Sequence, residues 1–483
     1  MRARPFGIML GLACLLGVGS AWADEPKNAA KHPIDIAGVW DTSFGLATIH
    51  TDPIEGKKVL SVTGFYMVEK DKKGIIRKGT FDPATGILEF TFFESWQGNS
   101  VGTARMTLSP DRNHLKGKFN QGSLKGEWNM TRMRGHDFAS GLDAIIADAG
   151  IHANTPGAAV LVLDHGEVAF RKMIGLAHLR DKKPITPTTT FELASVSKQF
   201  AGTAILRLYE QGKLALDDDV RKYLPELPVY DAKRPIRILN LARQTSGLPE
   251  YMDLEYVKGK DPRFVTNTDY VGEFAKQRAK FPLSFPTGSD WKYTNTNFML
   301  LALIVERVSK KPFAAFMKGE FFEPLKMTTA GVYEHPNFKP HEPALGYHKE
   351  KNEFRESWGP PPFRHESLLT VGDGSVWCSL DDMARWDDGW RLDKVLTPET
   401  IKLALVPSKY GKDQTTDYAF GWGVTLENGH LASMAHNGSW GGFHTLIHRD
   451  VAQQRTLIVL SNTESMDVEA VDRLFRAMPP KKE

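Results

Sequence analysis

The pattern of apolar residues changes near His136, and this change limits the folds that the chain can adopt. Before it, from about Ile36 to Arg132, apolar and polar residues alternate in short runs separated by turn residues, which is typical of β-strands with one buried face. After it, segments with helical spacing lie between strand-like segments. The sequence therefore predicts a small antiparallel β domain, either a barrel or a sandwich, followed by a larger α+β domain.

The first part carries its alternation most clearly in four runs, at residues 58–63, 86–92, 104–108 and 126–130. Turn residues separate the runs, and no convincing helix interrupts them. We expect the aromatic residues of this part to form its core rather than to bind a ligand, and they are Trp40, Phe65, Tyr66, Phe90, Phe92, Phe93, Trp96 and Trp128.

The second part begins with a helical pattern at residues 138–149. Strand-like segments at 158–163 and 168–170 enclose a short turn and predict a hairpin. Near the end of the chain, a strand at 457–460 precedes a helix at about 467–478. Because strands occur at both ends of this part with helices between them, we expect one mixed α+β unit.

The N-terminus has the pattern of a secretory signal peptide. Arginines at positions 2 and 4 precede an apolar stretch from Phe6 to Val18, and Ala21-Trp22-Ala23 supplies small residues for cleavage after Ala23. A lipoprotein signal cut before Cys14 is the alternative, but the apolar run ahead of that cysteine is too short. We therefore expect a periplasmic or secreted protein with a signal peptide at 1–23.

The remaining chain is expected to consist of a β domain at 36–135 and an α+β domain at 136–478. The length of 483 residues, with 41% hydrophobic and 25% charged residues, is typical of a globular protein with more than one domain.

A net charge of +3 with scattered basic residues argues against nucleic acid as a partner. After the signal no apolar run is long enough to span a membrane. Cys378 is then the only cysteine, so no internal disulfide is possible, and we expect it to be a small buried residue.

The first motif that indicates chemistry is Ser195-Val196-Ser197-Lys198. It opens a segment whose apolar residues lie on one helical face, so Lys198 should reach the hydroxyl of Ser195 and take its proton. A helix N-terminus also favours a developing negative charge.

Two other segments that match catalytic serine motifs are decoys. Ser289 to Lys292 repeats the spacing but follows a loop, and Gly98 to Gly102 resembles a nucleophile elbow but precedes a strand.

Two further motifs follow in the chain. Tyr293-Thr294-Asn295 precedes an apolar segment at 297–305, which predicts a buried helix, and a tyrosine beside a lysine can shuttle a proton. His436-Asn437-Gly438-Ser439 reads as a strand edge with little side-chain bulk, where the N–H groups of Ser439 and Ser195 could form an oxyanion hole. Taken singly, Tyr293 and His436 would be read as structural residues.

Together and in this order, the three motifs resemble those of the serine β-lactamase and penicillin-binding-protein superfamily, specifically its class C-like branch of esterases, D-peptidases and β-lactamases. The resemblance covers about residues 136–478. It implies an antiparallel sheet flanked by helices plus an all-helical subdomain, with the reactive serine between them. It also implies that Ser195 is the acylated nucleophile, Lys198 its general base, Tyr293 the group that protonates the leaving group, and Asn295 a ligand for the lysine and the substrate. No metal or organic cofactor is expected.

One departure from the family pattern affects the expected substrate. Many β-lactamases and transpeptidases have Lys-Thr-Gly or Lys-Ser-Gly in the third motif, where this chain has His436-Asn437-Gly438. Because histidine is only partly charged near neutrality, a substrate carboxylate should be held less firmly. We therefore expect an exported serine hydrolase that acts on esters, or on peptides and amides with D-residues, with weak or no turnover of β-lactams. Two alternatives remain open: a catalytically weak protein that binds cell-wall or peptide ligands, and a true class C-like β-lactamase. The sequence does not predict the oligomeric state.

Overall fold

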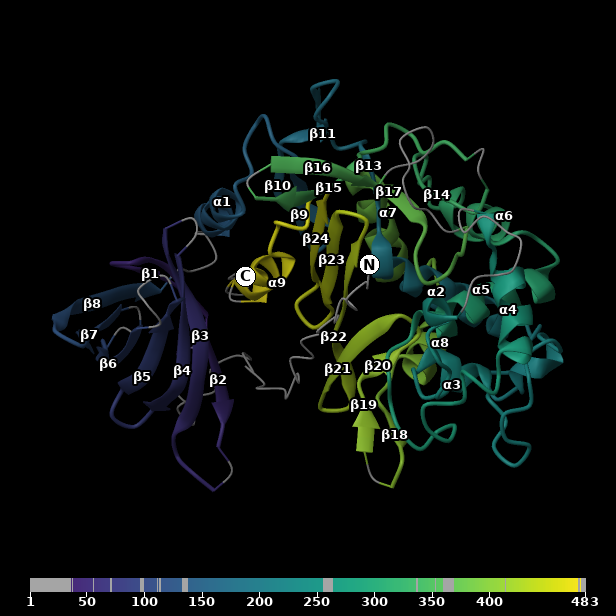
Figure 1. Ribbon diagram of the computed structural model, residues 1–483, viewed down its shortest axis with the longest axis horizontal. Helices are drawn as coiled ribbons and strands as arrows, with labels where there is room; N and C mark the ends of the chain where they lie inside the picture. The colour runs from purple at the N-terminus through teal and green to yellow at the C-terminus, as the bar shows by residue number, and fades with distance from the viewer. Residues whose placement is uncertain are drawn as a thin grey trace. The chain divides into compact units, whose positions relative to one another are not determined.

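The computed structural model describes residues 36, 38–54, 56–69, 72–95, 100–110, 112, 114–132, 138–254, 264–335, 338–351, 353–358, 369–412, 414–476 and 478. The chain divides into two compact units, Met1–Asp137 and Phe138–Glu483 (Figure 1). Each unit has its own hydrophobic core. The predicted signal peptide lies outside the described residues.

The first unit is a closed antiparallel barrel in which each strand pairs with the next and β1 pairs with β8. Its strands are β1 (Gly38–Thr42), β2 (Gly45–Pro53), β3 (Leu60–Glu69), β4 (Lys72–Asp82), β5 (Ile87–Glu94), β6 (Ser100–Leu108), β7 (His114–Gln121) and β8 (Leu124–Arg132). The all-β prediction is confirmed, and of the two architectures expected it is the barrel that forms. Closure pairs the strands that would otherwise be exposed at the sheet edges.

Aromatic side chains fill the barrel. Trp128 is buried, and the rings of Phe44, Tyr66, Phe90 and Phe92 pack edge-on around it at centroid distances of 4.7 to 5.3 Å. Most of the predicted core aromatics are buried, namely Trp40, Tyr66, Phe90, Phe92 and Trp128.

The prediction was wrong for two of these aromatics. Phe65 and Phe93 are only half-buried, because each directly adjoins a buried aromatic on a strand where successive side chains point to opposite faces. Trp96 lies outside the described residues.

A glycine provides room for one of the inner rings. A Cβ at Gly102 would lie only 2.1 Å from Cζ of Phe92, so the ring lies flat across the backbone of the neighbouring strand β6. At another interior position Tyr66 donates a hydrogen bond to Oε1 of the buried Glu94 at 2.5 Å, and Gln121 donates to Oε2 at 2.7 Å. Both oxygens of this side chain are therefore hydrogen-bonded, as burial of a polar group requires.

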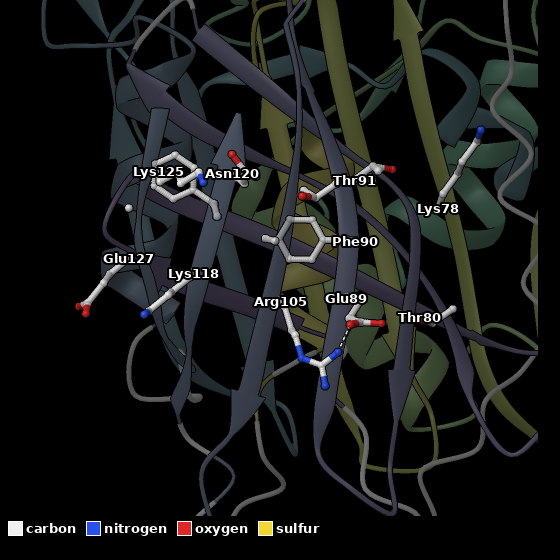
Figure 2. Close-up of a pocket in the computed structure, with 14 residues that line it drawn as sticks. Lys78, Thr80, Glu89, Phe90, Thr91, Arg105, Lys118, Asn120, Lys125 and Glu127 are labelled. Carbon is white, nitrogen blue, oxygen red and sulfur yellow. Dashed lines mark hydrogen bonds and ion pairs between the residues drawn. The ribbon is translucent and has the colours of Figure 1, made fainter. Parts of the chain in front are cut away.

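The wall of the barrel carries a shallow open hollow of about 900 Å³, drawn in Figure 2. Charged side chains of both signs surround it, including the Arg105–Glu89 ion pair between adjacent strands. Its lining residues are Lys78, Thr80, Glu89, Phe90, Thr91, Thr103, Ala104, Arg105, Lys118, Phe119, Asn120, Lys125, Gly126 and Glu127. Because acidic and basic groups are interspersed there, the hollow has no single sign of charge.

The second unit is built on a seven-stranded antiparallel sheet in the order β10-β9-β24-β23-β22-β21-β20 (Figure 1). Its strands are β9 (Ala158–Asp164), β10 (Glu167–Ile174), β20 (Tyr418–Ala419), β21 (Trp422–Glu427), β22 (His430–Trp440), β23 (Phe443–Asp450) and β24 (Arg455–Ser461). Three helices pack with this sheet, namely α1 (Phe138–Asp148), α7 (Leu380–Arg391) and α9 (Val468–Arg476). The predicted 158–170 hairpin is confirmed as β9 and β10.

Helices and short strands between β10 and β20 form the rest of this unit. The helices are α2 (Lys198–Glu210), α3 (Ile238–Ala242), α4 (Asn267–Lys276), α5 (Asn295–Ser309), α6 (Phe313–Met317) and α8 (Pro398–Ala404). The short strands are β11 (Leu176–His178), β12 (Lys183–Pro184), β13 (Thr190–Glu192), β14 (Gly331–Val332), β15 (Gly346–Glu350), β16 (Glu353–Trp358), β17 (Val376–Ser379), β18 (Ser408–Tyr410) and β19 (Gln414–Thr416).

Helix α5 is the centre of the helical part. It packs against α2, α3 and α4, and it is buried continuously from Thr296 to Val305, as its apolar sequence predicted. The α+β prediction is therefore confirmed, with helices beside an antiparallel sheet. Among the described residues, no helix is both long and apolar enough to cross a membrane.

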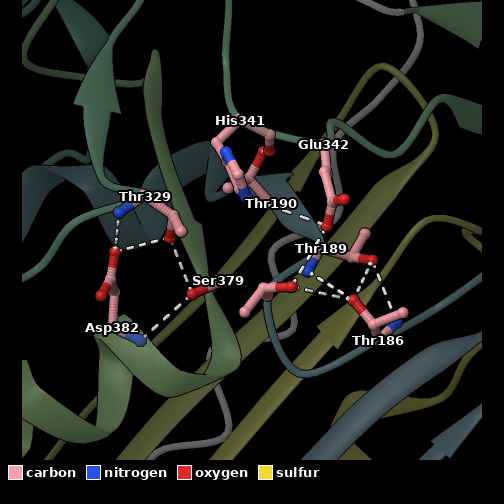
Figure 3. A network of polar contacts seen from close by, with 9 residues as sticks. Thr186, Thr189, Thr190, Thr329, His341, Glu342, Ser379 and Asp382 are labelled. Atoms are coloured by element: carbon pink, nitrogen blue, oxygen red, sulfur yellow. Dashed lines mark hydrogen bonds and ion pairs between the residues drawn. The ribbon is translucent and has the colours of Figure 1, made fainter.

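A small sheet of β13, β17 and β14 leads from this scaffold into the site. The polar network in Figure 3 fixes one end of it. Ser379, the last residue of β17, caps α7 by accepting the backbone N–H of Asp382, and Asp382 accepts the backbone N–H of Thr329 at 2.7 Å. On β13, Thr190 donates to the carbonyl oxygen of His341 at 2.6 Å. Cys378 in β17 is buried, as expected.

Candidate active site

Ser195 lies in a tight turn between a strand and a helix. Strand β13 ends at Glu192, a single 3₁₀ turn follows over Ala194–Ser197, and α2 begins at Lys198. Ala194 adopts a φ of +49°, in the left-handed region that residues with a side chain rarely occupy. The predicted position of Ser195 at a helix start is therefore found, with one 3₁₀ turn before the α-helix proper.

The amine of Lys198 joins the reactive serine to two distant parts of the chain. The residue is fully buried, and its Nζ donates to Ser195 Oγ at 2.9 Å, to Asn295 Oδ1 at 2.8 Å and to the carbonyl oxygen of Asp373 at 2.8 Å. An ammonium group has three donors, so each of them has an acceptor here. The structure thus brings together the first two sequence motifs and adds the Asp373 carbonyl.

The second motif is fixed at the start of α5. The ring centroid of Tyr293 lies 5.0 Å from Lys198 Nζ, and the ring is packed edge-on against Tyr418 at 5.9 Å. The backbone N–H of Asn295 donates to Oε2 of Glu250 at 2.9 Å. These contacts place the phenol and the amide next to the same buried amine.

The third motif approaches the serine along the part of strand β22 that does not pair with β21. Strand β22 pairs with β21 only as far as Ala435, whereas its pairing with β23 continues to Trp440. In this stretch a Cβ at Gly438 would lie 2.9 Å from the backbone nitrogen of Ser195. Only a glycine allows the strand to come so close to the nucleophile turn. Ser439, the next residue, is exposed.

The two ring nitrogens of His436 are both engaged within the protein. Nδ1 lies 2.5 Å from the carbonyl oxygen of Asn437, so it must be the protonated nitrogen, and Nε2 then accepts the hydroxyl of Tyr418 at 2.9 Å. Burial, together with the charge of Lys198, lowers the pKa of His436 to about 3. The imidazole is therefore neutral at pH 7 and supplies no positive charge.

Two acidic residues beside Lys198 were assigned no role from the sequence. Burial raises the pKa of Glu250 and of Asp373, and the charge of Lys198 opposes both shifts. The carboxylate of Asp373 accepts the hydroxyl of Tyr251 at 3.0 Å. Asp373 lies in a run of turn residues, and its bond to the amine uses a backbone carbonyl, which has no signature in sequence. Tyr418 was also missed, because only the fold brings it to His436.

Both decoy motifs prove to be structural. Ser289 lies in a turn where its N–H bonds to the carbonyl of Pro286, and no helix follows it directly. Ser100 begins strand β6 of the barrel, so the strand-turn-helix setting of a nucleophile elbow is lacking. Within the part of the chain that the structure describes, no group of three or more histidine, cysteine or acidic residues could hold a metal ion.

Comparison with known proteins agrees with this arrangement. A family model described as Beta-lactamase matches residues 142–477. Penicillin-binding protein 4* of Bacillus subtilis is 30% identical over 329 residues, which cover 66% of this chain and 70% of that protein. Protein flp of Staphylococcus aureus is 28% identical over 343 residues, and the match spans 68% of this chain but only 64% of the relative.

Solved structures share the fold. A D-amino acid amidase from Ochrobactrum anthropi, solved with L-phenylalanine amide, aligns with a TM-score of 0.55 at 20% identity. The alignment covers 71% of this chain and 98% of the amidase. Identity at this level supports a common fold and leaves the substrate to be argued from the site.

The close approach of Gly438 to the serine can be tested by adding a methyl group. In Gly438→Ala the new Cβ would also lie 2.6 Å from the carbonyl oxygen of Leu193, so strand and turn must separate, and we expect hydrolysis of a model ester to fall about 10²-fold. Gly423→Ala on β21 is the matched control, because its Cβ would meet Ala435 O at an ordinary 3.5 Å. Equal rates for the two variants would show that the approach does not matter.

Proposed function

We propose that this chain, which belongs to the β-lactamase family of serine hydrolases, cleaves esters or D-residue amides through an acyl-enzyme on Ser195. The observation that carries the proposal is the 2.9 Å hydrogen bond between Lys198 Nζ and Ser195 Oγ, in a site where the amine is fully buried. A serine becomes a useful nucleophile only when an adjacent base can take its proton. The proposed hydrolase domain is 136–478, and the β domain at 36–135 is a separate part of the protein.

In the proposed reaction, Ser195 Oγ attacks the scissile carbonyl carbon while its proton moves to Lys198. The resting contact has the amine donating to the hydroxyl, so the reactive form is the one in which Lys198 is neutral and the same contact runs in the opposite direction. Tyr293, with its ring 5.0 Å from the amine, then passes a proton to the departing alkoxide or amine. Attack by water, with the proton transfers reversed, releases the acyl group and restores Ser195.

Negative charge on the carbonyl oxygen would be received by the N–H groups of Ser195 and Ser439. This assignment is supported by the contact of Gly438 with the nucleophile turn, since Ser439 directly follows that glycine on the free stretch of β22. Thr445 Oγ1 also donates to the carbonyl oxygen of Leu193 at 2.7 Å, which ties β23 to the same turn. Preorganised donors of this kind are typically worth about 10²- to 10³-fold in rate.

The charge state of the third motif favours substrates without a carboxylate at that position. A neutral His436, whose ring nitrogens are taken by Tyr418 and by the Asn437 carbonyl, has neither the charge nor a free donor for an anionic group. Esters and D-residue amides do not require such a cation. The fold shared with a D-amino acid amidase is consistent with this substrate class.

We also propose that the protein is exported, with residues 1–23 removed as a signal peptide. The mature protein would then begin at Asp24. Sequencing the N-terminus of protein recovered from the periplasm or medium tests this, and an intact N-terminus on protein confined to the cytoplasm would exclude it.

The identity of the nucleophile can be tested with a fluorophosphonate probe, which reacts with activated serines. We expect rapid labelling of the wild-type protein and none of Ser195→Ala, because the reacting oxygen is gone. Ser289→Ala is the control, since it removes the serine of the second Ser-x-x-Lys copy, and it should be labelled like wild type. Undiminished labelling of Ser195→Ala would contradict the assignment.

The role of the third motif can be tested by restoring a cation. We expect His436→Lys to raise the kcat/KM for nitrocefin, which carries a carboxylate, relative to that for a p-nitrophenyl ester by about tenfold or more, as a charge-assisted hydrogen bond would. His436→Gln keeps a neutral side chain and should leave that ratio near the wild-type value. Wild-type protein that hydrolyses nitrocefin as fast as the ester would overturn this interpretation.

A further inference from the structure

One buried carboxylate lies behind the site and has no place in the mechanism described so far. Glu192 is the last residue of β13, and its side chain is 1% exposed. Its Oε2 accepts the backbone N–H of Ala194 at 2.9 Å, and its Oε1 accepts the backbone N–H of Ser375 at 2.7 Å. The two oxygens of one carboxylate therefore join two loops that are far apart in sequence.

Both residues held in this way adopt the left-handed conformation. Ala194 has a φ of +49° and Ser375 a φ of +74°. Residues with a Cβ are strained in this region, and such strain persists only where the surroundings hold the backbone in place. The bonds from Glu192 reach the N–H groups of these same two residues, so the carboxylate supports both strained turns.

Each turn positions one of the groups around Lys198. The turn at Ala194 is immediately followed by Ser195, whose Oγ accepts from the amine. The turn at Ser375 closes the loop that presents the carbonyl oxygen of Asp373 to the same amine. A shift of either turn would lengthen a hydrogen bond to Lys198 Nζ.

We propose that Glu192 is a positioning residue whose ionised carboxylate holds these two turns, so that Ser195 Oγ and the Asp373 carbonyl both stay on the Lys198 amine. The inference rests on the proposed hydrolase function. The hydrogen bonds of Glu192 go to the backbone of Ala194 and Ser375 and not to the side chains of Ser195 or Lys198.

The proton affinity of Glu192 makes this support dependent on pH. Burial raises the pKa of Glu192 to about 7; the Asp373 carboxylate adds to the shift, and the two N–H groups and Lys198 oppose it. Of the neighbouring titratable groups, Glu250 and His436 interact with Lys198 rather than with Glu192. Cys378 on the adjacent strand β17 is kept neutral because burial raises its pKa.

The sign of the pH effect follows from the two acceptors. Ionised Glu192 can accept both N–H groups, whereas the protonated acid replaces one acceptor oxygen by a hydroxyl that must itself find a partner. Activity should therefore fall as the pH drops through about 7. The free energy of unfolding changes in the opposite direction. A carboxyl whose pKa is raised in the folded protein stabilises the folded state most at low pH, and this contribution is lost as the pH rises through the folded-state pKa.

The test compares the pH dependence of kcat/KM for a p-nitrophenyl ester in wild type and Glu192→Gln. At a pH above 8 we expect the variant to be slower by about 10²-fold, the effect of displacing catalytic groups by about 1 Å. Below pH 7 the ratio of the wild-type kcat/KM to the variant kcat/KM should fall by about tenfold per pH unit, because wild-type Glu192 itself becomes neutral. Circular dichroism and thermal unfolding verify that the variant is folded.

Asp382→Asn is the matched control. Asp382 is also a fully buried carboxylate that accepts a backbone N–H, from Thr329 at 2.7 Å, but it lies at the opposite end of β17. Its removal should lower the unfolding temperature and leave the shape of the pH profile as in wild type.

Two results for Glu192→Gln would overturn the proposal: a wild-type rate above pH 8, or the same slowing at every pH. If Glu192→Gln does not fold, a second variant tests the proposal. In Ala194→Gly the turn no longer needs support for its positive φ, because glycine adopts this conformation readily. The fall of kcat/KM below pH 7 should therefore be shallower than in wild type. An unchanged fall would also overturn the proposal. Failure of the proposed function is distinguishable, because wild-type protein would then neither turn over esters nor react with a fluorophosphonate.

Discussion

The site depends on the burial of a single amine. Lys198 Nζ is removed from solvent, and its three donors are taken by Ser195 Oγ, Asn295 Oδ1 and the Asp373 carbonyl. A buried ammonium that lacked any of these partners would be costly, so the three chain segments that supply them are drawn to one point. Because Ser195 Oγ is one of these three acceptors, burial of the amine also positions the proposed nucleophile next to its base. The stability of the interior and the proposed chemistry therefore depend on the same contacts.

The three atoms that accept hydrogen bonds from this amine belong to neutral groups, although buried acidic side chains lie nearby. On one side a glycine in β22 allows the strand to touch the serine turn, and the histidine of the third motif is held neutral. On the other side, Glu192 and Glu250 accept backbone N–H groups rather than contact the amine. The site therefore holds the serine and the lysine in place while offering no positive charge from its third motif, which is the basis for proposing neutral ester and amide substrates.

Much of this could be predicted from the sequence. The Ser-x-x-Lys spacing and the apolar helix after Tyr293 are local patterns with direct physical meaning, and they identified Ser195 and Asn295 as two of the three groups that meet at the amine. Barrel or sandwich could not be decided, because closure depends on pairing between β1 and β8, which are far apart in sequence. The support from Asp373 and Glu192 was not predicted either, since it runs through backbone groups and through loops that only the fold brings together.

The most direct test of the central claim is to identify the residue that carries the acyl group. A slowly hydrolysed ester would be mixed with the protein, the reaction stopped with acid within the first turnover, and the digested peptides analysed by mass spectrometry. The account predicts the mass of the acyl group on the peptide that contains Ser195 and nowhere else. Rapid turnover with no acylated peptide, or an acyl group on another residue, would contradict it.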